Sequence, residues 1–204
     1  MTIRFIGFAS PRSGTAWLSN FLSHGESSYC QHEALYGCGS MDDYKERIDS
    51  YDTPVRGSID TASPFLAQYI YDGLKEDGYQ MFILTREPDE VRKSLESISI
   101  SDDALQATYD GISWLMMKDN RIPVITYQNL FRASTLRMLW NYLGIAAPFP
   151  VHKLRMLREM LVEDGRIKGF GRFASEEGCA ADMKRFACMY EGLVAEKEAF
   201  TNGS

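Results

Sequence analysis

The segment from Phe8 to Trp17 combines small residues with one proline and one arginine, which suits the binding of an anion. It reads F-A-S-P-R-S-G-T-A-W and lies between a short apolar run and a run with the apolar spacing of a buried helical face. Small residues allow successive backbone N–H groups to point into one concavity. The N-terminus of the following helix adds unpaired donors and about half a positive charge. The segment therefore predicts a phosphate cradle between a strand and a helix.

This cradle differs from the loop of nucleotide triphosphatases, which is written G-x-x-x-x-G-K-[ST] and needs a lysine after its second glycine. In this chain Thr15 follows Gly14, and Ala9 occupies the place of the first glycine. The segment thus predicts a phosphate site of another kind. The alternative is an ordinary strand-to-helix connection in which Ser13 or Thr15 caps the helix.

A second segment, which also follows an apolar run, carries an arginine, a proline and a serine. Arg86 and Ser94 are eight positions apart, and Pro88 lies between them. Proline is favoured as the first residue of a helix because its missing N–H would be unpaired there. We therefore expect Arg86 to follow the end of a strand and Ser94 to lie on the next helix. Together they would grip one phosphate monoester.

These two segments together resemble the sulfotransferases that use 3′-phosphoadenosine 5′-phosphosulfate as their donor. The family's 5′-phosphosulfate loop reads roughly P-[RK]-S-G-T-[TS]-W-L, and it is matched here by Pro11, Arg12, Ser13, Gly14, Thr15, Trp17 and Leu18. Ala16 stands where the family has a hydroxyl residue. The family's 3′-phosphate motif R-x-P-x-x-x-x-x-S is matched in full by Arg86, Pro88 and Ser94. The resemblance covers roughly the first half of the chain.

The resemblance implies a sulfonate transfer from the donor to an acceptor hydroxyl or amine, leaving 3′-phosphoadenosine 5′-phosphate as product. Arg12 would stabilise the charge that builds on the bridging oxygen, and Ser13 would lie near the sulfonate. No metal is expected. The donor-binding residues implied by the resemblance are Pro11, Arg12, Ser13, Gly14, Thr15, Ala16, Trp17, Arg86 and Ser94. Packing in the core is the alternative role for Trp17.

The acceptor must lose a proton, which requires a base within hydrogen-bond reach. The resemblance implies Glu33, because glycan-modifying members of the family place a glutamate after the second strand. Members acting on small phenols and alcohols use a histidine after the third strand, where this chain has Asp60. His32 and Asp60 are therefore the other candidates for the base. Their alternative roles are a strand-end histidine and an N-cap for a helix starting near Pro64. Ala62 replaces a lysine frequent in the glycan-modifying branch.

The rest of the chain must form a fold that positions these segments. Helical patterns alternate with short apolar runs, which predicts a mainly parallel sheet with helices on both faces and ligands beyond the carboxyl ends of the strands. The expected strands are residues 3–8, 28–31, 55–59, 80–84 and 122–126. The expected helices are residues 13–23, 64–76, 89–99, 102–118 and 130–143. The resemblance implies the P-loop NTPase-like architecture of the sulfotransferases.

We expect one α/β domain over residues 1–204, with a core in residues 1–143 that holds the donor motifs and a helical part in residues 144–204. Within the helical part, residues 151–163 and 176–199 have helical patterns. The Gly-Phe-Gly turn at residues 169–171 resembles the basic, glycine-rich loop that closes on the 3′-phosphate in some sulfotransferases. Segments 34–54, 99–110 and 145–175 are the expected variable loops that choose the acceptor.

The composition of the chain argues against several classes of partner. The net charge of −6 gives no general attraction for nucleic acid. No apolar run has the length of a membrane span, and no signal peptide is recognisable, so a cytoplasmic protein is expected. The four cysteines and three histidines have no metal-ligand spacing. The expected partner is a small-molecule or glycan acceptor, and the short chain is consistent with a homodimer.

Two other classes of function fit the same segments. A small-molecule or nucleotide kinase on a P-loop scaffold would need a lysine after Gly14, which is absent. A non-catalytic module that binds 3′-phosphoadenosine nucleotides would keep the cradle without a working base. A sulfotransferase is the reading that both motifs favour.

Overall fold

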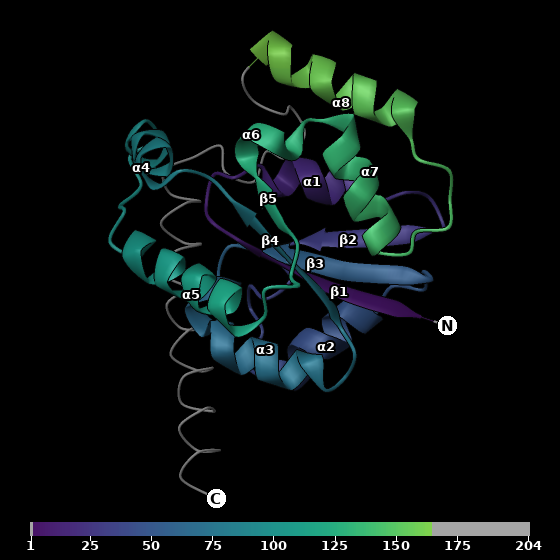
Figure 1. The fold of residues 1–204 in the computed structure, drawn as a ribbon, viewed down its shortest axis with the longest axis horizontal. Coiled ribbons are helices and arrows are strands. Elements are labelled where there is room, and N and C mark those ends of the chain that lie inside the picture. The colour runs from purple at the N-terminus through teal and green to yellow at the C-terminus, as the bar shows by residue number, and fades with distance from the viewer. Residues whose placement is uncertain (1, 165–204) are drawn as a thin grey trace, which may run out of the picture.

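The computed structural model describes residues 2–164 and contains one sheet of five parallel strands with helices on both faces (Figure 1). The strand order is β2-β3-β1-β4-β5, and each neighbouring pair is parallel. The strands are β1 (Ile3–Ala9), β2 (Ser28–His32), β3 (Val55–Asp60), β4 (Gln80–Thr85) and β5 (Val124–Thr126). The predicted α/β class and the five expected strands are therefore confirmed, with β5 shorter than expected.

The helices agree with the sequence pattern, with one subdivision and two additions, α2 and α6. The helix expected over residues 64–76 is a 3₁₀ turn, η1 (Ser63–Leu66), followed by α3. The helix expected over residues 130–143 is α7, and the short α6, which ends at Leu130, precedes it. The helices are α1 (Thr15–Leu22), α2 (Met41–Asp49), α3 (Ala67–Lys75), α4 (Pro88–Glu96), α5 (Leu105–Lys118), α6 (Tyr127–Leu130), α7 (Ala133–Tyr142) and α8 (Val151–Asp164).

Helix α2 lies within residues 34–54, which the sequence analysis treated as a variable loop. Ser40 caps this helix, because its hydroxyl accepts a hydrogen bond from the Asp43 N–H at 3.1 Å. The buried residues Met41, Tyr44 and Ile48 follow the three- and four-residue spacing of a helical face. The cap and this spacing are a helix signal that the sequence analysis missed.

The faces of the sheet follow from the direction of each crossover. The connection from β1 to β2 runs opposite to the later ones, and parallel crossovers are right-handed. Helix α1 must therefore cover the face opposite to α2, α3 and α5, which is the arrangement in Figure 1. Ligands of such sheets bind beyond the carboxyl ends of the strands where the crossover direction reverses, which here is the end of β1.

Strand β1 separates two hydrophobic cores. Ile6 and Phe8 pack with α2, α3 and α5, whereas Phe5 and Ala9 pack with α1, α7 and α8. Neighbouring residues of a strand point to opposite faces, so the all-apolar run is the expected pattern for a central strand with both faces covered. The rigid strand thus ends where the candidate cradle begins.

Two expectations concern residues 165–204, outside the described part of the chain. They are the helix over residues 176–199 and the turn at residues 169–171.

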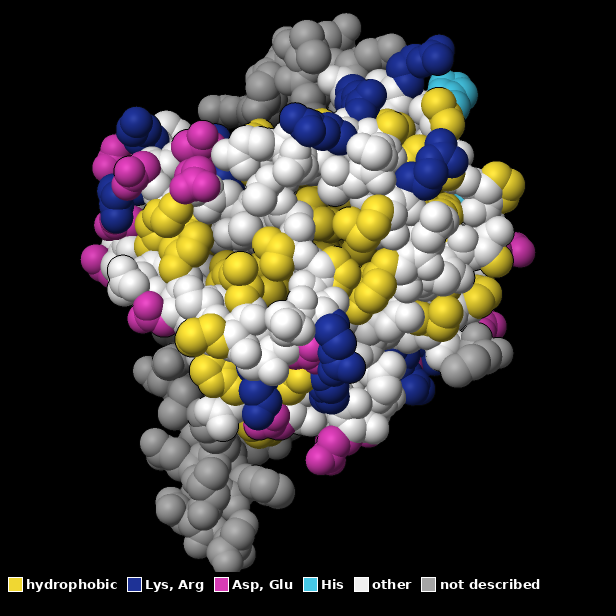
Figure 2. All heavy atoms as spheres, viewed as in Figure 1, with side chains coloured by type: hydrophobic (Ala, Val, Ile, Leu, Met, Phe, Trp, Pro, Cys, Tyr) yellow, Lys and Arg dark blue, Asp and Glu magenta, His cyan; other side chains and the backbone are white. Residues whose placement is uncertain are grey.

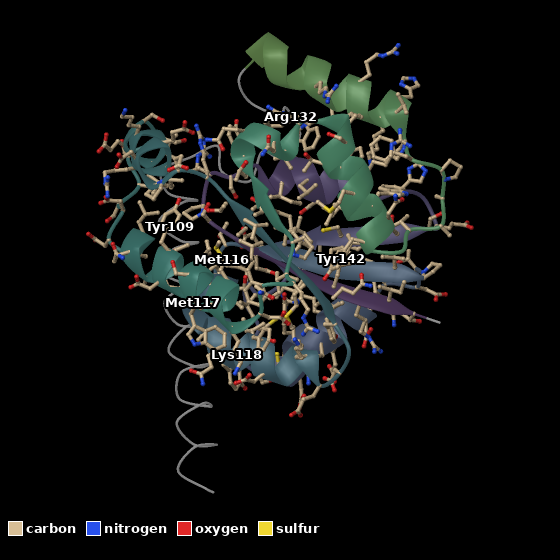
Figure 3. The ribbon with its side chains drawn as sticks, in the orientation of Figure 1. Tyr109, Met116, Met117, Lys118, Arg132 and Tyr142 are labelled. Atoms are coloured by element: carbon tan, nitrogen blue, oxygen red, sulfur yellow. The ribbon has the colours of Figure 1, made fainter. Side chains whose placement is uncertain are left out.

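Within residues 2–164, none of the helices has the length and apolar character needed to cross a membrane. Figure 2 shows hydrophobic side chains on the face that carries α5 and the edge strand β5. Met116 and Met117, labelled in Figure 3, are exposed there.

Candidate functional site

The loop between β1 and α1 is tightly bonded internally and begins the helix without a side-chain cap. The Ser10 N–H donates to the Leu84 carbonyl at 2.9 Å, and the buried Ser13 hydroxyl donates to the Ser10 carbonyl at 2.6 Å. Gly14 is the N-cap, and the first turn of α1 contains no acidic residue. The alternative reading, with Ser13 or Thr15 as the cap, is therefore wrong. The first amides of α1 are left available for an anion.

The loop requires left-handed backbone at two positions. Arg12 has φ 59° and Gly14 has φ 90°. A Cβ on Gly14 would also lie 2.6 Å from Cδ2 of Leu130, so glycine is demanded both by conformation and by space. A non-glycine residue such as Arg12 in this region stores backbone strain, which is frequent at binding sites.

Arg86, which directly follows β4, ties the second segment to the loop. Its N–H donates to the Ser10 hydroxyl at 3.0 Å, and its Nη1 donates to the Arg12 carbonyl at 3.1 Å. Its guanidinium lies 4.2 Å from the centre of the Tyr127 ring and pairs with Glu90 at 2.9 Å. The arginine is thus held from several sides at the carboxyl ends of the strands.

Helix α4 brings Ser94 to the same place. Pro88 is the first residue of α4, as predicted, and Ser94 lies on that helix. The Ser94 hydroxyl accepts a hydrogen bond from Arg12 Nε at 3.0 Å, although the two residues are 82 positions apart. Arg86 and Ser94 therefore meet through Arg12, which contacts the first with its carbonyl and the second with its guanidinium. The two sequence motifs form one cluster.

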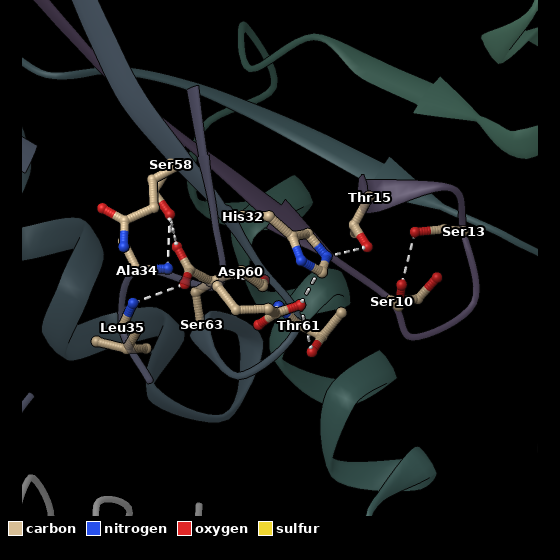
Figure 4. A network of polar contacts seen from close by, with 12 residues as sticks. Ser10, Ser13, Thr15, His32, Ala34, Leu35, Ser58, Asp60, Thr61 and Ser63 are labelled. Carbon is tan, nitrogen blue, oxygen red and sulfur yellow. Dashed lines mark hydrogen bonds and ion pairs between the residues drawn. The ribbon is translucent and has the colours of Figure 1, made fainter. Parts of the chain in front are cut away.

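His32 is the last residue of β2, and Glu33 follows it. Figure 4 shows the His32 ring beside Thr15. His32 Nε2 is 2.9 Å from the Thr15 hydroxyl and 3.5 Å from Oε1 of Glu33. Their side chains are 22% and 21% exposed, so both are reachable from solvent. Burial lowers the pKa of His32 to about 4, which keeps the imidazole neutral near neutral pH. Burial, and then the nearby Asp60, raise the pKa of Glu33.

Thr61, which the sequence analysis did not select, fixes the Glu33 carboxyl group. The Thr61 N–H donates to Oε2 at 2.9 Å, and its hydroxyl donates to Oε1 at 3.0 Å. Glu33 itself has φ 57°, and its N–H donates to the Ile59 carbonyl at 3.0 Å. The position of Thr61 just after the third strand was the available signal, since carboxyl ends of neighbouring parallel strands meet at one edge.

Asp60 lies deeper and is fully buried. Its carboxyl group accepts hydrogen bonds from the Leu35 N–H at 2.7 Å and the Tyr44 hydroxyl at 2.8 Å, and a third from the Ser58 hydroxyl. Burial raises its pKa. The alternative role as an N-cap is wrong, because Ala62 is the N-cap of η1 and the Asp60 carboxyl group accepts from these three donors, of which Figure 4 shows Leu35 and Ser58.

The remaining residues of the implied donor site lie in or just after the loop. Pro11 is in its turn, and Ala16 is in the first turn of α1. Trp17 is 1% exposed, stacks on Phe21 and donates from Nε1 to the Leu157 carbonyl at 3.1 Å. Trp17 therefore packs in the core, which agrees with its alternative role.

A hollow of about 480 Å³ lies between α4 and α5, close to the cluster. The Tyr109 hydroxyl at its wall donates to the Arg86 carbonyl. Part of segment 99–110, expected to contact the acceptor, contributes to this wall. The lining residues are Pro88, Arg92, Asp102, Leu105, Gln106, Tyr109 and Ser113.

Among residues 2–164, no group of three or more His, Cys, Asp or Glu is placed to hold a metal ion.

No protein-family model matches the sequence, and a search of curated proteins finds no match either. The case for a function therefore depends on the geometry of the site.

Proposed function

We propose that this protein is a sulfotransferase that takes the sulfonate group from 3′-phosphoadenosine 5′-phosphosulfate, on the P-loop-like architecture of that family. The observation that carries the proposal is the meeting of the two motifs. Arg12 contacts Ser94 at 3.0 Å and Arg86 at 3.1 Å, although these residues come from segments more than seventy positions apart. Two cationic side chains and a hydroxyl at one place suit a phosphate monoester.

The residues present fit such a donor. The uncapped first turn of α1 and the left-handed Gly14 leave backbone amides for the 5′-phosphate, beside the Thr15 hydroxyl. Arg86 and Ser94 would hold the 3′-phosphate, and Arg12 lies between the two groups. When bound, the donor supplies the sulfonate group and a phosphate leaving group. The chain's own part is to orient the donor and to stabilise negative charge.

Glu33 is the best-placed candidate for the base. Its side chain is 21% exposed, and its carboxyl group has a raised pKa and is held by two hydrogen bonds from Thr61. A base needs a pKa near the working pH, and burial provides that change for a carboxyl group. Asp60 is less suited, because its oxygens already accept three hydrogen bonds inside the protein.

Two other functions remain as alternatives. A P-loop kinase would use a lysine where this chain has Thr15, so it would have to find that charge elsewhere. A non-catalytic module would bind the same nucleotide without transferring a group. The acceptor is proposed to be a small molecule or a glycan, and the protein is proposed to work in the cytoplasm.

Titration calorimetry without added metal tests the donor site. We expect 3′-phosphoadenosine 5′-phosphate to bind at least tenfold more tightly than AMP, a difference of about 1.4 kcal/mol. Arg86→Ala should remove this preference. Arg92→Ala is the matched control, because Arg92 is a nearby arginine on α4 that pairs with Asp89 and Asp102.

Equal binding of AMP would overturn the proposal, and tighter binding of ATP with magnesium would favour the kinase. If the 3′-phosphorylated nucleotide is preferred, transfer of labelled sulfonate to a panel of sugar and phenol acceptors separates an enzyme from a binding module. We expect Glu33→Gln to abolish that transfer while leaving nucleotide affinity within about threefold, which is below 1 kcal/mol.

A further inference from the structure

We propose that His32 is a positioning residue that couples occupation of the phosphate cradle to the protonation of Glu33, by moving its Nε2 contact from the Thr15 hydroxyl to the Glu33 carboxyl group. This inference rests on the proposed function and deepens it. It adds a device that makes the base ready only when the donor is bound.

The geometry that carries the inference is a chain of contacts across the loop (Figure 4). Thr15, the first residue of α1, lies at the phosphate cradle. Its hydroxyl is 2.9 Å from His32 Nε2, and the same nitrogen is 3.5 Å from Oε1 of Glu33. One imidazole nitrogen thus has two neighbours, and only the nearer is within hydrogen-bond distance. Oε1 is also the oxygen that accepts from the Thr61 hydroxyl.

A phosphate monoester in the cradle competes for the Thr15 hydroxyl. Hydroxyl groups have one hydrogen to donate, and a phosphate oxygen is a stronger acceptor than an imidazole nitrogen. When Thr15 donates to phosphate, Nε2 loses that hydrogen bond. In the proposed resting state the neutral imidazole carries its hydrogen on Nδ1 and accepts from Thr15 at Nε2. Once Thr15 is withdrawn, Nδ1 gives its hydrogen to water, Nε2 takes one from water, and Nε2 donates it to Oε1 of Glu33. That hydrogen bond favours the carboxylate, so the Glu33 proton leaves to solvent while His32 stays neutral.

The charged and titratable groups around Glu33 are consistent with this change. His32 is contributed by β2, and Asp60 lies at the end of β3. Tyr44, on α2, faces Asp60, and Arg47 on the same helix donates to the Ala34 and Tyr36 carbonyls. The Glu33 carboxyl group itself contacts the His32 ring and the Thr61 hydroxyl. The low pKa of His32 and the raised pKa of Glu33 agree with a neutral starting pair.

Nitrogen NMR of histidine-labelled protein tests the first step. The chain has three histidines, and His32→Gln assigns the His32 signals. We expect saturating 3′-phosphoadenosine 5′-phosphate to convert Nε2 of His32 from an unprotonated to a protonated nitrogen signal. Thr15→Val should show the protonated signal without nucleotide, whereas Thr15→Ser should behave as the native protein.

Calorimetry in two buffers of different ionisation enthalpy tests the second step by counting protons released on nucleotide binding near neutral pH. We expect the native protein to release more protons than Glu33→Gln, by up to one per site, and His32→Gln to lose the same difference. The nucleotide's own phosphates contribute equally to all three proteins, so the comparison removes them.

The outcomes distinguish this inference from the proposed function. If the 3′-phosphorylated nucleotide is preferred over AMP but the His32 signals and the proton count do not change, the coupling is wrong and the donor site stands. If the nucleotide is not preferred, both proposals fail. A change of His32 signals with no difference between native protein and Glu33→Gln in proton release also overturns the coupling.

Discussion

Asp60 is a single buried residue whose carboxyl group accepts hydrogen bonds from three different segments of the chain. Its carboxyl group holds the turn after β2 through Leu35, the helix α2 through Tyr44, and its own strand through Ser58. Asp60→Ala would leave these donors without a partner inside the protein. Each such group costs about 1–3 kcal/mol. We expect the free energy of unfolding to fall by about 3 kcal/mol or more, as measured by urea denaturation.

Tyr44→Phe is the matched control for Asp60, because it removes one donor and keeps the ring. We expect it to cost about 1 kcal/mol, the net value of one hydrogen bond. If Asp60→Ala were as mild as Tyr44→Phe, the three hydrogen bonds would not be the reason for burying this carboxyl group.

Burial and Asp60 raise the pKa of Glu33, and two hydrogen bonds from Thr61, one from its N–H and one from its hydroxyl, lower it. The hydrogen bonds from Thr61 favour the carboxylate and so oppose the upward effect of burial. Thr61→Val removes the hydroxyl contact at 3.0 Å and keeps the backbone one. We expect the pKa of Glu33 to rise further, which a carbon NMR titration of the labelled carboxyl group would measure.

Thr61→Ser keeps the hydroxyl and should leave the Glu33 pKa near its native value. An unchanged pKa in Thr61→Val would mean that the backbone N–H alone holds the carboxyl group. The sequence shows that Thr61 follows a predicted strand, but the contact itself also requires that β2 and β3 are neighbours in the sheet, and no local pattern gives the strand order.

The loop after β1 is the element on which the donor site depends. Gly14 has φ 90°, and a Cβ there would meet Leu130 of α6 at 2.6 Å. Gly14→Ala therefore shifts the loop or α6 and misaligns the amides of α1. We expect at least a tenfold loss in affinity for 3′-phosphoadenosine 5′-phosphate, about 1.4 kcal/mol, by calorimetry.

Gly78→Ala is the control for Gly14→Ala, because it introduces the same kind of backbone strain away from the candidate site. Gly78 also has a positive φ, 75°, but an added Cβ there would meet no atom within 4 Å. The variant should lose about 1 kcal/mol of stability and bind nucleotide normally. Equal affinity of Gly14→Ala and the native protein would contradict the cradle.

Helix α5 packs unusually close to η1, and Gly111 makes that approach possible. A Cβ on Gly111 would lie 1.9 Å from the Pro64 carbonyl oxygen, so backbone would have to move. We expect Gly111→Ala to lower the free energy of unfolding by about 1–3 kcal/mol, the usual cost of overpacking. Gly73→Ala in α3 has its nearest neighbour at 3.9 Å and should instead stabilise the protein by up to about 1 kcal/mol, by thermal or urea unfolding.

The strands were predictable from sequence because their apolar runs have few alternatives. Residues 3–8 and 80–84 are central strands with both faces covered, so nearly every side chain is apolar. The signal of α2 was weaker, since only three of its residues are buried and the rest are polar. Phe131, between α6 and α7, packs edge-on against Trp17, a contact between distant segments that no local pattern specifies.

At the scale of the whole molecule, the sheet explains why residues far apart in sequence form one site. Parallel strands β1, β3 and β4 are neighbours, so the segments that follow them meet at one edge. The places of Arg12 and Arg86 at this edge were predictable, because each motif follows a recognisable strand. The direct contact between Arg12 and Ser94 was not, because it depends on the direction of α4 in space.

The titratable groups with shifted pKa values make the free energy of unfolding of the whole molecule depend on pH. The raised pKa values of Glu33 and Asp60 mean that the folded protein binds more protons than the unfolded chain above about pH 4. Stability from these groups is present at low pH and lost as pH rises through their folded pKa values. His32 acts in the opposite direction, because its pKa falls from 6.5 to about 4 on folding.

Single isosteric variants should separate these opposing effects. Between about pH 4 and pH 6.5, folding excludes a proton from His32, so its contribution to stability increases with pH. Glu33→Gln removes a contribution that decreases with pH, and the slope of unfolding free energy against pH should become more positive. His32→Gln should make the same slope more negative. Urea denaturation at a series of pH values measures both slopes, and a shift of both variants in the same direction would contradict the neutral His32–Glu33 pair on which the coupling to the cradle depends.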